Sequence, residues 1–329
     1  MGDGTKGNPY TREDVLKLIE QNGGRAEHLN LSKKWFVRRI ALNELDLKGI
    51  VLEGAHLEEV RLIGANIESA FLEQAHLEGA NLSGAHLEHA NLVGTHLEQA
   101  ELFGVHLEGA ELFDAHLDEA NLIDAFLDRT RLNGAHFNGV RMRSAKFTAN
   151  TNMHSIDWGD YILGEEKEWE KKKKETYLLR DAEDIYRRLK QWYSNAGMYD
   201  IAGKFFYREM EAKRKAQSWK KEFKSKLWSW VLKLLCGYGE KWERVIFSSA
   251  AVILLFTIIY FGFNSVWEWY AFWRSLYFSL VSFTTSAWVD EKVIVVQDDL
   301  MRGLGVAESF IGVFMMALFL VTFTRKMTR

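Results

Sequence analysis

Residues 80–99 read ANLSGAHLEHANLVGTHLEQ, four units of five residues with leucine at the third place and alanine or threonine at the first. From Leu47 to Phe147 every fifth residue is large and apolar, and 17 of these 21 positions are leucine. Two residues before 20 of these 21 positions lies a small or β-branched residue, alanine in 14 cases. Neither an α-helix nor a flat strand keeps a period of five on one face. A chain that turns a corner every five residues keeps this period on one face. Four such corners close a square coil with leucine and alanine inside.

This repeat resembles the motif A-(D/N)-L-x-x of the pentapeptide-repeat family over about residues 42–157. The resemblance implies a right-handed quadrilateral β-helix, assigned here to residues 42–158, with successive coils about 4.8 Å apart. An open end of such a coil exposes apolar side chains and unpaired backbone, and so needs a cap. Residues 1–41 are expected to supply a capping helix and lead-in. Thr11 and Asp14 have the spacing of a capping box at its start.

Residues 20 apart stack in such a coil, so the outward histidines form columns. One column holds His56, His76, His96, His116 and His136, and His86 and His106 lie on the opposite face. Residues 44–128 hold 18 acidic and two basic residues, a net charge of −16. Three interpretations remain open for this surface. It is a solvated face, a docking surface for a protein or cation that senses pH through histidine, or a DNA mimic, since some soluble pentapeptide-repeat proteins bind gyrase that way. No metal site is expected, because neighbours about 5 Å apart rarely converge on one ion.

Residues 159–218 have helical spacing and are interpreted as an adaptor. Tyr193, Gly197, Tyr199, Ala202 and Phe206 resemble one tetratricopeptide-type helix hairpin. One such unit cannot bury its apolar face alone, so it is expected to dock on the end of the coil, on the pore or on a neighbouring subunit. Residues 204–233 hold ten basic and three acidic residues. The tryptophans that interrupt this run predict an interfacial helix within residues 219–244. Nucleic-acid binding is the alternative for this basic run, but the apolar segments that follow favour the membrane, so no nucleic-acid partner is expected.

Residues 245–329 are interpreted as a pore domain in the lipid bilayer. Residues 245–263 carry no charge and residues 303–324 carry one, and each segment is long enough to span the membrane. Between them, residues 271–285 are apolar but too short to span, which predicts a re-entrant pore helix. Basic residues cluster before the first span and after the second, so both termini are expected in the cytoplasm. The single cysteine of the chain, Cys236, fits a reducing cytoplasm. We expect a multi-pass protein of a prokaryotic plasma membrane.

Two segments of this region resemble the two-helix potassium-channel family. Residues 275–285 look like its pore helix and leading threonines, and residues 308–314 are similar to its gated inner helix. The resemblance implies a homo-oligomer of four subunits, and an altered filter makes five conceivable. It also makes Gly312 a hinge. One and two turns further along the same helix face, Met316 and Leu320 are predicted to form an apolar gate.

The filter region departs from that family. It reads Thr284, Thr285, Ser286, Ala287, Trp288, Val289 and Asp290, with both filter glycines replaced. Carbonyls that replace the hydration shell of potassium require φ > 0 at alternate residues, which glycine adopts freely and valine does not. Poor potassium selectivity is therefore predicted. Asp290 and Glu291 would form an outer acidic ring that favours cations.

The intramembrane acid Glu308 has two interpretations: a functional group in the helix bundle, or a structural hydrogen bond to the back of the pore loop. The sequence as a whole favours an oligomeric channel for inorganic ions. The alternative is a membrane-anchored interaction protein with a non-conducting, pore-like domain. No Ser-His-Asp arrangement, phosphate loop or zinc-ligand spacing occurs, so neither enzymatic activity nor a cofactor is expected.

Overall fold

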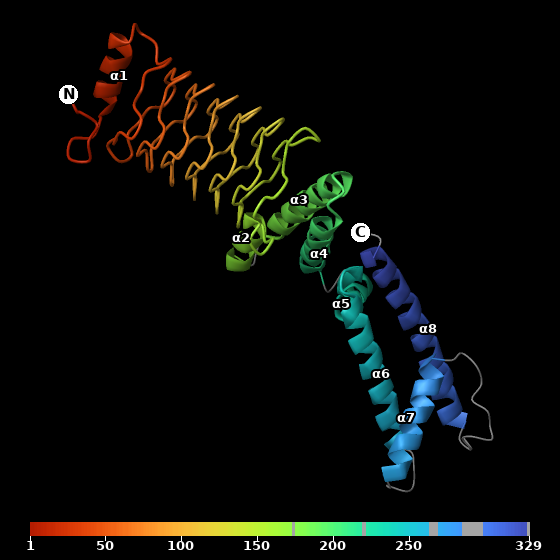
Figure 1. The fold of residues 1–329 in the computed structure, drawn as a ribbon. Coiled ribbons are helices and arrows are strands. Elements are labelled where there is room, and N and C mark those ends of the chain that lie inside the picture. Colours follow the sequence, from red (N-terminus) through yellow and green to blue (C-terminus); the bar gives the residue numbers. More distant parts are fainter. Residues whose placement is uncertain (173–174, 219–221, 263–268, 285–298, 328–329) are drawn as a thin grey trace. The chain divides into compact units, whose positions relative to one another are not determined.

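The computed structural model describes residues 1–172, 175–218, 222–262, 269–284 and 299–327. They form two units, Met1–Ala216 and Gln217–Arg329, which are described separately (Figure 1). The first unit is a coil that carries four helices: α1 Arg12–Gln21, α2 Gly164–Lys172, α3 Thr176–Asn195 and α4 Tyr199–Ala216. The second unit holds α5 Phe223–Cys236, the 3-10 turn η1 Gly237–Gly239, α6 Trp242–Gly262, α7 Trp269–Thr284 and α8 Asp299–Met327.

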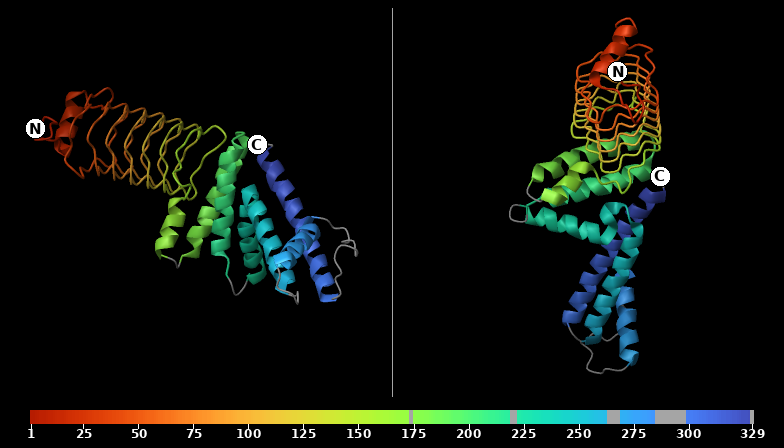
Figure 2. Two further views of the ribbon diagram at one scale, coloured as in Figure 1. Left: turned by 60° about the horizontal axis from the view of Figure 1, so that its bottom comes forward. Right: turned by 90° about the vertical axis from the view of Figure 1, so that its left-hand side faces the viewer.

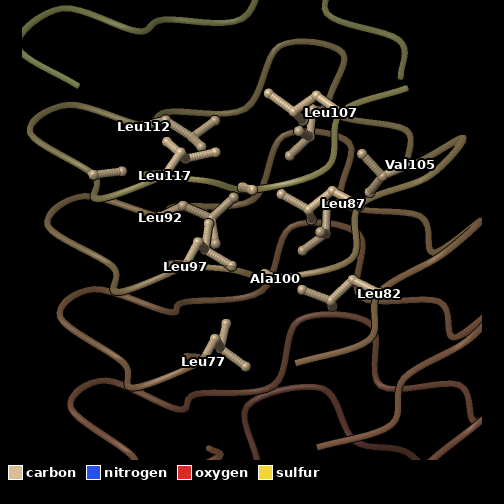
Figure 3. Packing of buried hydrophobic residues seen from close by; sticks show 14 of the residues in the cluster. Leu77, Leu82, Leu87, Leu92, Leu97, Ala100, Val105, Leu107, Leu112 and Leu117 are labelled. Atoms are coloured by element: carbon tan, nitrogen blue, oxygen red, sulfur yellow. The ribbon is translucent and has the colours of Figure 1, made fainter. Parts of the chain in front are cut away.

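The coil confirms the five-residue period. Parallel bridges join residues 20 apart, from Ala41↔Arg61 through to Phe126↔Lys146. Backbone amides donate to the next coil, as from Leu92 N to Glu111 O at 2.7 Å. The repeating leucines and alanines point inward and are almost fully buried, and Figure 3 shows the leucines stacked in columns. In the right-hand view of Figure 2 successive coils lie over one another. These residues form a quadrilateral β-helix.

Each corner of the coil depends on one residue with positive φ. Every fifth residue from Glu44 to Ser144 has φ between 52° and 75°. Each corner from Gly49 to Ser144 is also closed by a hydrogen bond across three residues, as from Ala55 N to Leu52 O at 3.0 Å. Positive φ at the third residue of a turn is the signature of type II geometry. About half of the corner residues are glycine, which takes this conformation without strain.

The coil begins earlier than the boundary drawn from the sequence. Asn30 pairs with Val51 and Trp35 with His56, both within the segment assigned to the lead-in. These pairs are 21 residues apart, so the first coil holds one extra residue. The capping box of Thr11 and Asp14 is present and opens α1. Val15 of α1 closes the coil interior at this end.

The far end of the coil departs from the strict period. Arg131 pairs with Asn152 and His136 with Asp157, again 21 residues apart. The extra residue follows Phe147, which the repeat predicted to point inward; Phe147 packs against the core but is only partly buried, with Arg188 over its ring. Beyond this shift the inward residues are Met153 and Trp158.

The helix hairpin of α3 and α4 closes this end, so the docking expected of the adaptor occurs on the coil. The Trp158 indole donates to the Tyr193 hydroxyl at 2.8 Å, and this hydroxyl donates to Met153 O at 2.8 Å. Phe205 of α4 packs edge-on against Trp158, with ring centroids 5.1 Å apart. The hairpin thereby buries its apolar face against the last coil.

Glu165, at the start of α2, replaces the next coil as a hydrogen-bond partner. Its Oε1 accepts from the backbone amides of Met142 and Arg143 at 2.7 and 2.8 Å. Its Oε2 is buried and meets no donor among the residues that the structure describes. Burial raises the pKa of Glu165 to about 7, although the two amides and the charge of Arg141 favour the ionised form. Glu165 therefore caps the last ladder, and we expect the stability of this cap to depend on pH.

The second unit agrees with the predicted segments to within a few residues. α6 starts three residues before the predicted span, and α8 extends past it at both ends. Both helices are long and apolar enough to cross a membrane, judged by length and composition. α5 occupies the middle of the predicted interfacial segment and leaves several apolar side chains exposed, among them Phe223, Trp228, Trp230 and Leu234.

Replacing Glu165 by glutamine should remove a pH dependence of coil stability. A rise in pKa from 4.5 to about 7 corresponds to about 3 kcal/mol. This stability is present below pH 4.5 and is lost as the pH rises through 7, because the folded state then has to bury a charge. Thermal unfolding of wild type and Glu165→Gln, compared between pH 5 and 8, measures this pH dependence. Glutamine keeps the acceptor for both amides, so equal pH dependence in the two proteins would contradict this role.

Candidate functional site

The short helix α7 has one polar face. Ser275, Ser279 and Ser282 follow a spacing of four and three residues, and all three are buried. The hydroxyl of Ser279 donates to Ile253 O of α6 at 2.9 Å. The carbonyl of Ser282 accepts from the Ser309 hydroxyl of α8 at 2.7 Å. α7 is thus tied to both long helices through this face.

Glu308 of α8 lies at the meeting point of the three helices and is 0% exposed. One carboxylate oxygen accepts a hydrogen bond from the Tyr260 hydroxyl of α6 at 2.8 Å. The other makes a short hydrogen bond with the Ser279 hydroxyl of α7. Of the two interpretations of Glu308, this geometry matches a structural hydrogen bond to the back of the short helix. An acid in an apolar span is costly unless it is paired in this way.

Two glycines of α8 face α7, but only at Gly312 does the close approach exclude a side chain. A Cβ added to Gly312 would lie 1.9 Å from the carbonyl oxygen of Phe283, so no side chain fits there. A Cβ on Gly305 would lie 3.4 Å from the Phe278 ring. With Ser309 between them, these residues form a small-residue face of the kind that allows tight helix packing in membranes. The predicted hinge Gly312 is therefore also a packing residue, in a helix that is continuous through it.

The predicted gate residues lie together on α8. Met316 and Leu320 line an apolar groove of about 520 Å³ between α6 and α8, and both are exposed in the single chain. Val245, Ile246 and Ile253 of α6 form its other wall. That Met316 and Leu320 face a pore axis remains a prediction.

Most of the predicted filter lies outside the described residues. These positions are Thr285, Ser286, Ala287, Trp288, Val289 and Asp290, together with Glu291 of the acidic ring. Thr284 is the last described residue of α7, and its hydroxyl donates to Leu280 O at 2.7 Å. The filter and the acidic ring therefore remain predictions from sequence.

Sequence reasoning missed three residues of this junction: Tyr260, Ser279 and Gly305. The spacing of the α7 serines was a usable signal, since buried hydroxyls in an apolar segment need partners. Tyr260 gave no comparable signal, because tyrosine near the end of a span is ordinary. The contact between Tyr260 and Glu308 joins residues 48 apart, and it follows from how the helices pack.

Comparisons with known proteins bear on the coil. The model of the family described as pentapeptide repeats matches residues 42–79, 80–117 and 110–148. Together with the bridges 20 residues apart, this match makes the coil a pentapeptide-repeat domain. A comparison with curated proteins finds no match.

Three solved structures are similar to the chain. QnrB1, a plasmid-mediated fluoroquinolone resistance protein, is 17% identical over 42% of this chain and 84% of its own, with a TM-score of 0.29. Rfr23 from the cyanobacterium Cyanothece 51142 is 23% identical over 44% of this chain and 98% of its own, with a TM-score of 0.20. HetL from the cyanobacterium Nostoc, involved in heterocyst differentiation regulation, is 21% identical over 45% of this chain and 94% of its own, with a TM-score of 0.14. At such TM-scores the assignment depends on the family model and the bridges.

The close approach at Gly312 predicts different outcomes for two glycines of α8. Gly312→Ala should destabilise the second unit by about 1–3 kcal/mol, since the added methyl overlaps the Phe283 carbonyl. Gly303→Ala is the matched control, because a Cβ there meets nothing within 4 Å and alanine favours the helix. Thermal unfolding of the full chain in detergent measures both. Equal midpoints for the two variants would show that α7 does not pack on α8 at this point.

Proposed function

We propose that the chain is a subunit of a homo-oligomeric ion channel in which α6, α7 and α8 form the pore unit and the pentapeptide-repeat domain is cytoplasmic. The filter sequence favours a cation-permeable pore with poor potassium selectivity. The pore belongs to the oligomer, because two spans and one short helix do not enclose a channel. Four copies are favoured, as the resemblance of residues 275–285 implies.

The observation that carries the proposal is how α7 is held. With 16 residues, α7 reaches about 24 Å, less than the hydrocarbon thickness. A short apolar helix between two spanning helices is tolerated where protein surrounds its ends. The buried Glu308 supplies such surroundings by binding both Ser279 of α7 and Tyr260 of α6. A short helix held against two spanning helices in this way is the arrangement expected of a re-entrant pore helix.

The exposed side chains of α8 support association of several copies. Phe310, Val313, Leu320 and Val321 are exposed although the helix is apolar. Lipid covers part of such a surface, and neighbouring subunits would cover the remainder. An apolar row that includes Met316 and Leu320 could close a pore by dewetting.

Selectivity follows from the filter residues. A valine with φ > 0 costs of order 1–3 kcal/mol in each subunit. Val289 and Ala287 therefore disfavour the carbonyl ladder that selects potassium. Asp290 and Glu291 of each copy would form a ring of negative charge at the mouth and raise the local cation concentration.

The alternative is a membrane-anchored interaction protein with a non-conducting, pore-like domain. The altered filter motivates it, because a chain that cannot form the carbonyl ladder need not conduct. The acidic surface of the coil would then serve a partner protein. Conduction by the purified chain separates the two functions.

Recording from the purified full-length chain in planar bilayers tests the proposal. With potassium on one side and sodium on the other, the reversal potential should lie near zero, because the pore does not distinguish the two ions strongly. Replacing both Ala287 and Val289 by glycine should shift it toward the potassium equilibrium potential. Asp290→Asn with Glu291→Gln should lower cation conductance and leave assembly intact.

Three results would count against this account. A wild-type reversal potential that follows potassium alone would contradict the filter argument. One that follows chloride would contradict the acidic ring. A chain that assembles in the bilayer but carries no current would favour the interaction protein.

A further inference from the structure

Histidine rings of successive coils stack face to face. We call His56, His76, His96, His116 and His136 the long ladder, and His86 and His106 the short ladder. In the long ladder neighbouring ring centroids are 4.6–4.9 Å apart and the planes differ by 1–7°. In the short ladder the separation is 4.7 Å, and Phe126 continues the stack at 4.3 Å. The repeat thus aligns imidazoles with the same edge outward.

A carboxylate lies beside most ladder histidines. The Nδ1 atoms of His56, His76, His86, His96 and His106 lie 3.0–3.4 Å from a carboxylate oxygen of the glutamate two residues further along. When Nε2 carries the proton, Nδ1 keeps its lone pair, and Nδ1 and the carboxylate oxygen both offer electron pairs to one cation. Imidazole nitrogen and carboxylate oxygen are ligand types that divalent transition metals accept.

The second oxygen of several of these glutamates lacks a partner. Oε2 is buried and meets no hydrogen-bond donor within the described part of the chain at Glu78, Glu88, Glu98 and Glu108. A buried carboxylate oxygen without a donor is costly, and like charges repeat in the same column one coil away. A cation at these positions would remove both penalties.

Four groups bring two histidines and a carboxylate close together. They are His56–Glu58–His76, His86–Glu88–His106, His96–Glu98–His116 and His116–Asp118–His136, and within each the ligand atoms lie within 4.8 Å of one another. Zinc binds imidazole nitrogen and carboxylate oxygen at about 2.0–2.2 Å, so two nitrogens on one ion lie at most about 4.2 Å apart. The ring edges must therefore tilt together by roughly 1 Å. The rings are a quarter to half exposed, which leaves them room to tilt.

We propose that each of these trios binds one divalent transition-metal ion, with an imidazole from each of two successive coils and the carboxylate between them. Imidazole with carboxylate suits Zn²⁺, Ni²⁺ and Cu²⁺. Spacing alone argued against a metal, because two stacked rings do not converge on one ion. The carboxylate beside each pair, and the unpartnered Oε2 of Glu88 and Glu98 in two of the trios, change that conclusion. The site does not depend on whether the chain conducts ions.

The trios predict a defined stoichiometry. Two of the four share His116, so only one of these two can be filled at a time. Wild-type chain therefore binds three ions. His116→Phe removes both trios that use this residue and leaves two ions. His96→Phe removes one of the same two trios, but His116–Asp118–His136 remains and the chain still binds three.

Isothermal titration of the full-length chain with Zn²⁺ alone at pH 7.5, followed by elemental analysis, counts these ions. The chain is purified without a polyhistidine tag. Phenylalanine is a matched replacement, since Phe126 already stacks in the short ladder. His89→Asn is the control outside both ladders; His89 is exposed with φ 59°, which asparagine tolerates, and this variant should bind three ions.

A variant that keeps every histidine tests the same proposal if a ring replacement fails to fold. Glu88→Gln should weaken binding at the short ladder by about 10–100-fold, because it removes the carboxylate charge. No Zn²⁺ bound to wild type, or equal ion counts in His96→Phe and His116→Phe, would overturn the proposal. So would unchanged Zn²⁺ affinity at every site of Glu88→Gln.

Discussion

The first unit depends on one constraint: residues 20 apart pair with each other across successive coils through backbone hydrogen bonds. Each coil satisfies its amides and carbonyls only if the next coil repeats the same path. Leucine and alanine then fall in columns inside along most of the coil, and the larger Phe137 and Trp158 lie near its far end. The same constraint leaves two unsatisfied ends. α1 closes one end with Val15, and Glu165 with the α3–α4 hairpin closes the other.

The register also governs the surface of the coil. Whatever points outward at one coil meets a residue of the same column in the next, about 4.8 Å away. Histidines can stack in this way, and Phe126 and Lys146 extend the short ladder by ring stacking and by a cation over the Phe126 ring. Carboxylates cannot stack without cost, because their charges repel. Lys48 and Arg131 offset this repulsion by pairing with Glu68 and Glu111, respectively.

The sequence predicted the coil, its columns and the order of helices, because a period of five and long apolar runs are local signals. It did not predict where the coil starts or the extra residue after Phe147, since both depend on how the ends are capped. Glu308 was recognised as unusual, but its partners Tyr260 and Ser279 were not, because they come from other helices. Gly312 was interpreted as a hinge, whereas the Phe283 carbonyl shows that close packing also requires glycine there. Each of these features depends on residues that are distant in the sequence and close together in the fold.

In the second unit, a carboxylate bound by hydroxyls from two helices holds a short helix against two long ones. One chain cannot enclose a pore with this arrangement, so the proposed function requires a ring of subunits. The mass of the full-length chain in detergent, measured by light scattering with the detergent contribution subtracted, tests this requirement most directly. The account predicts about four times the 38.1 kDa chain mass, and five copies would also close a ring. A monomer at the same concentration would contradict it.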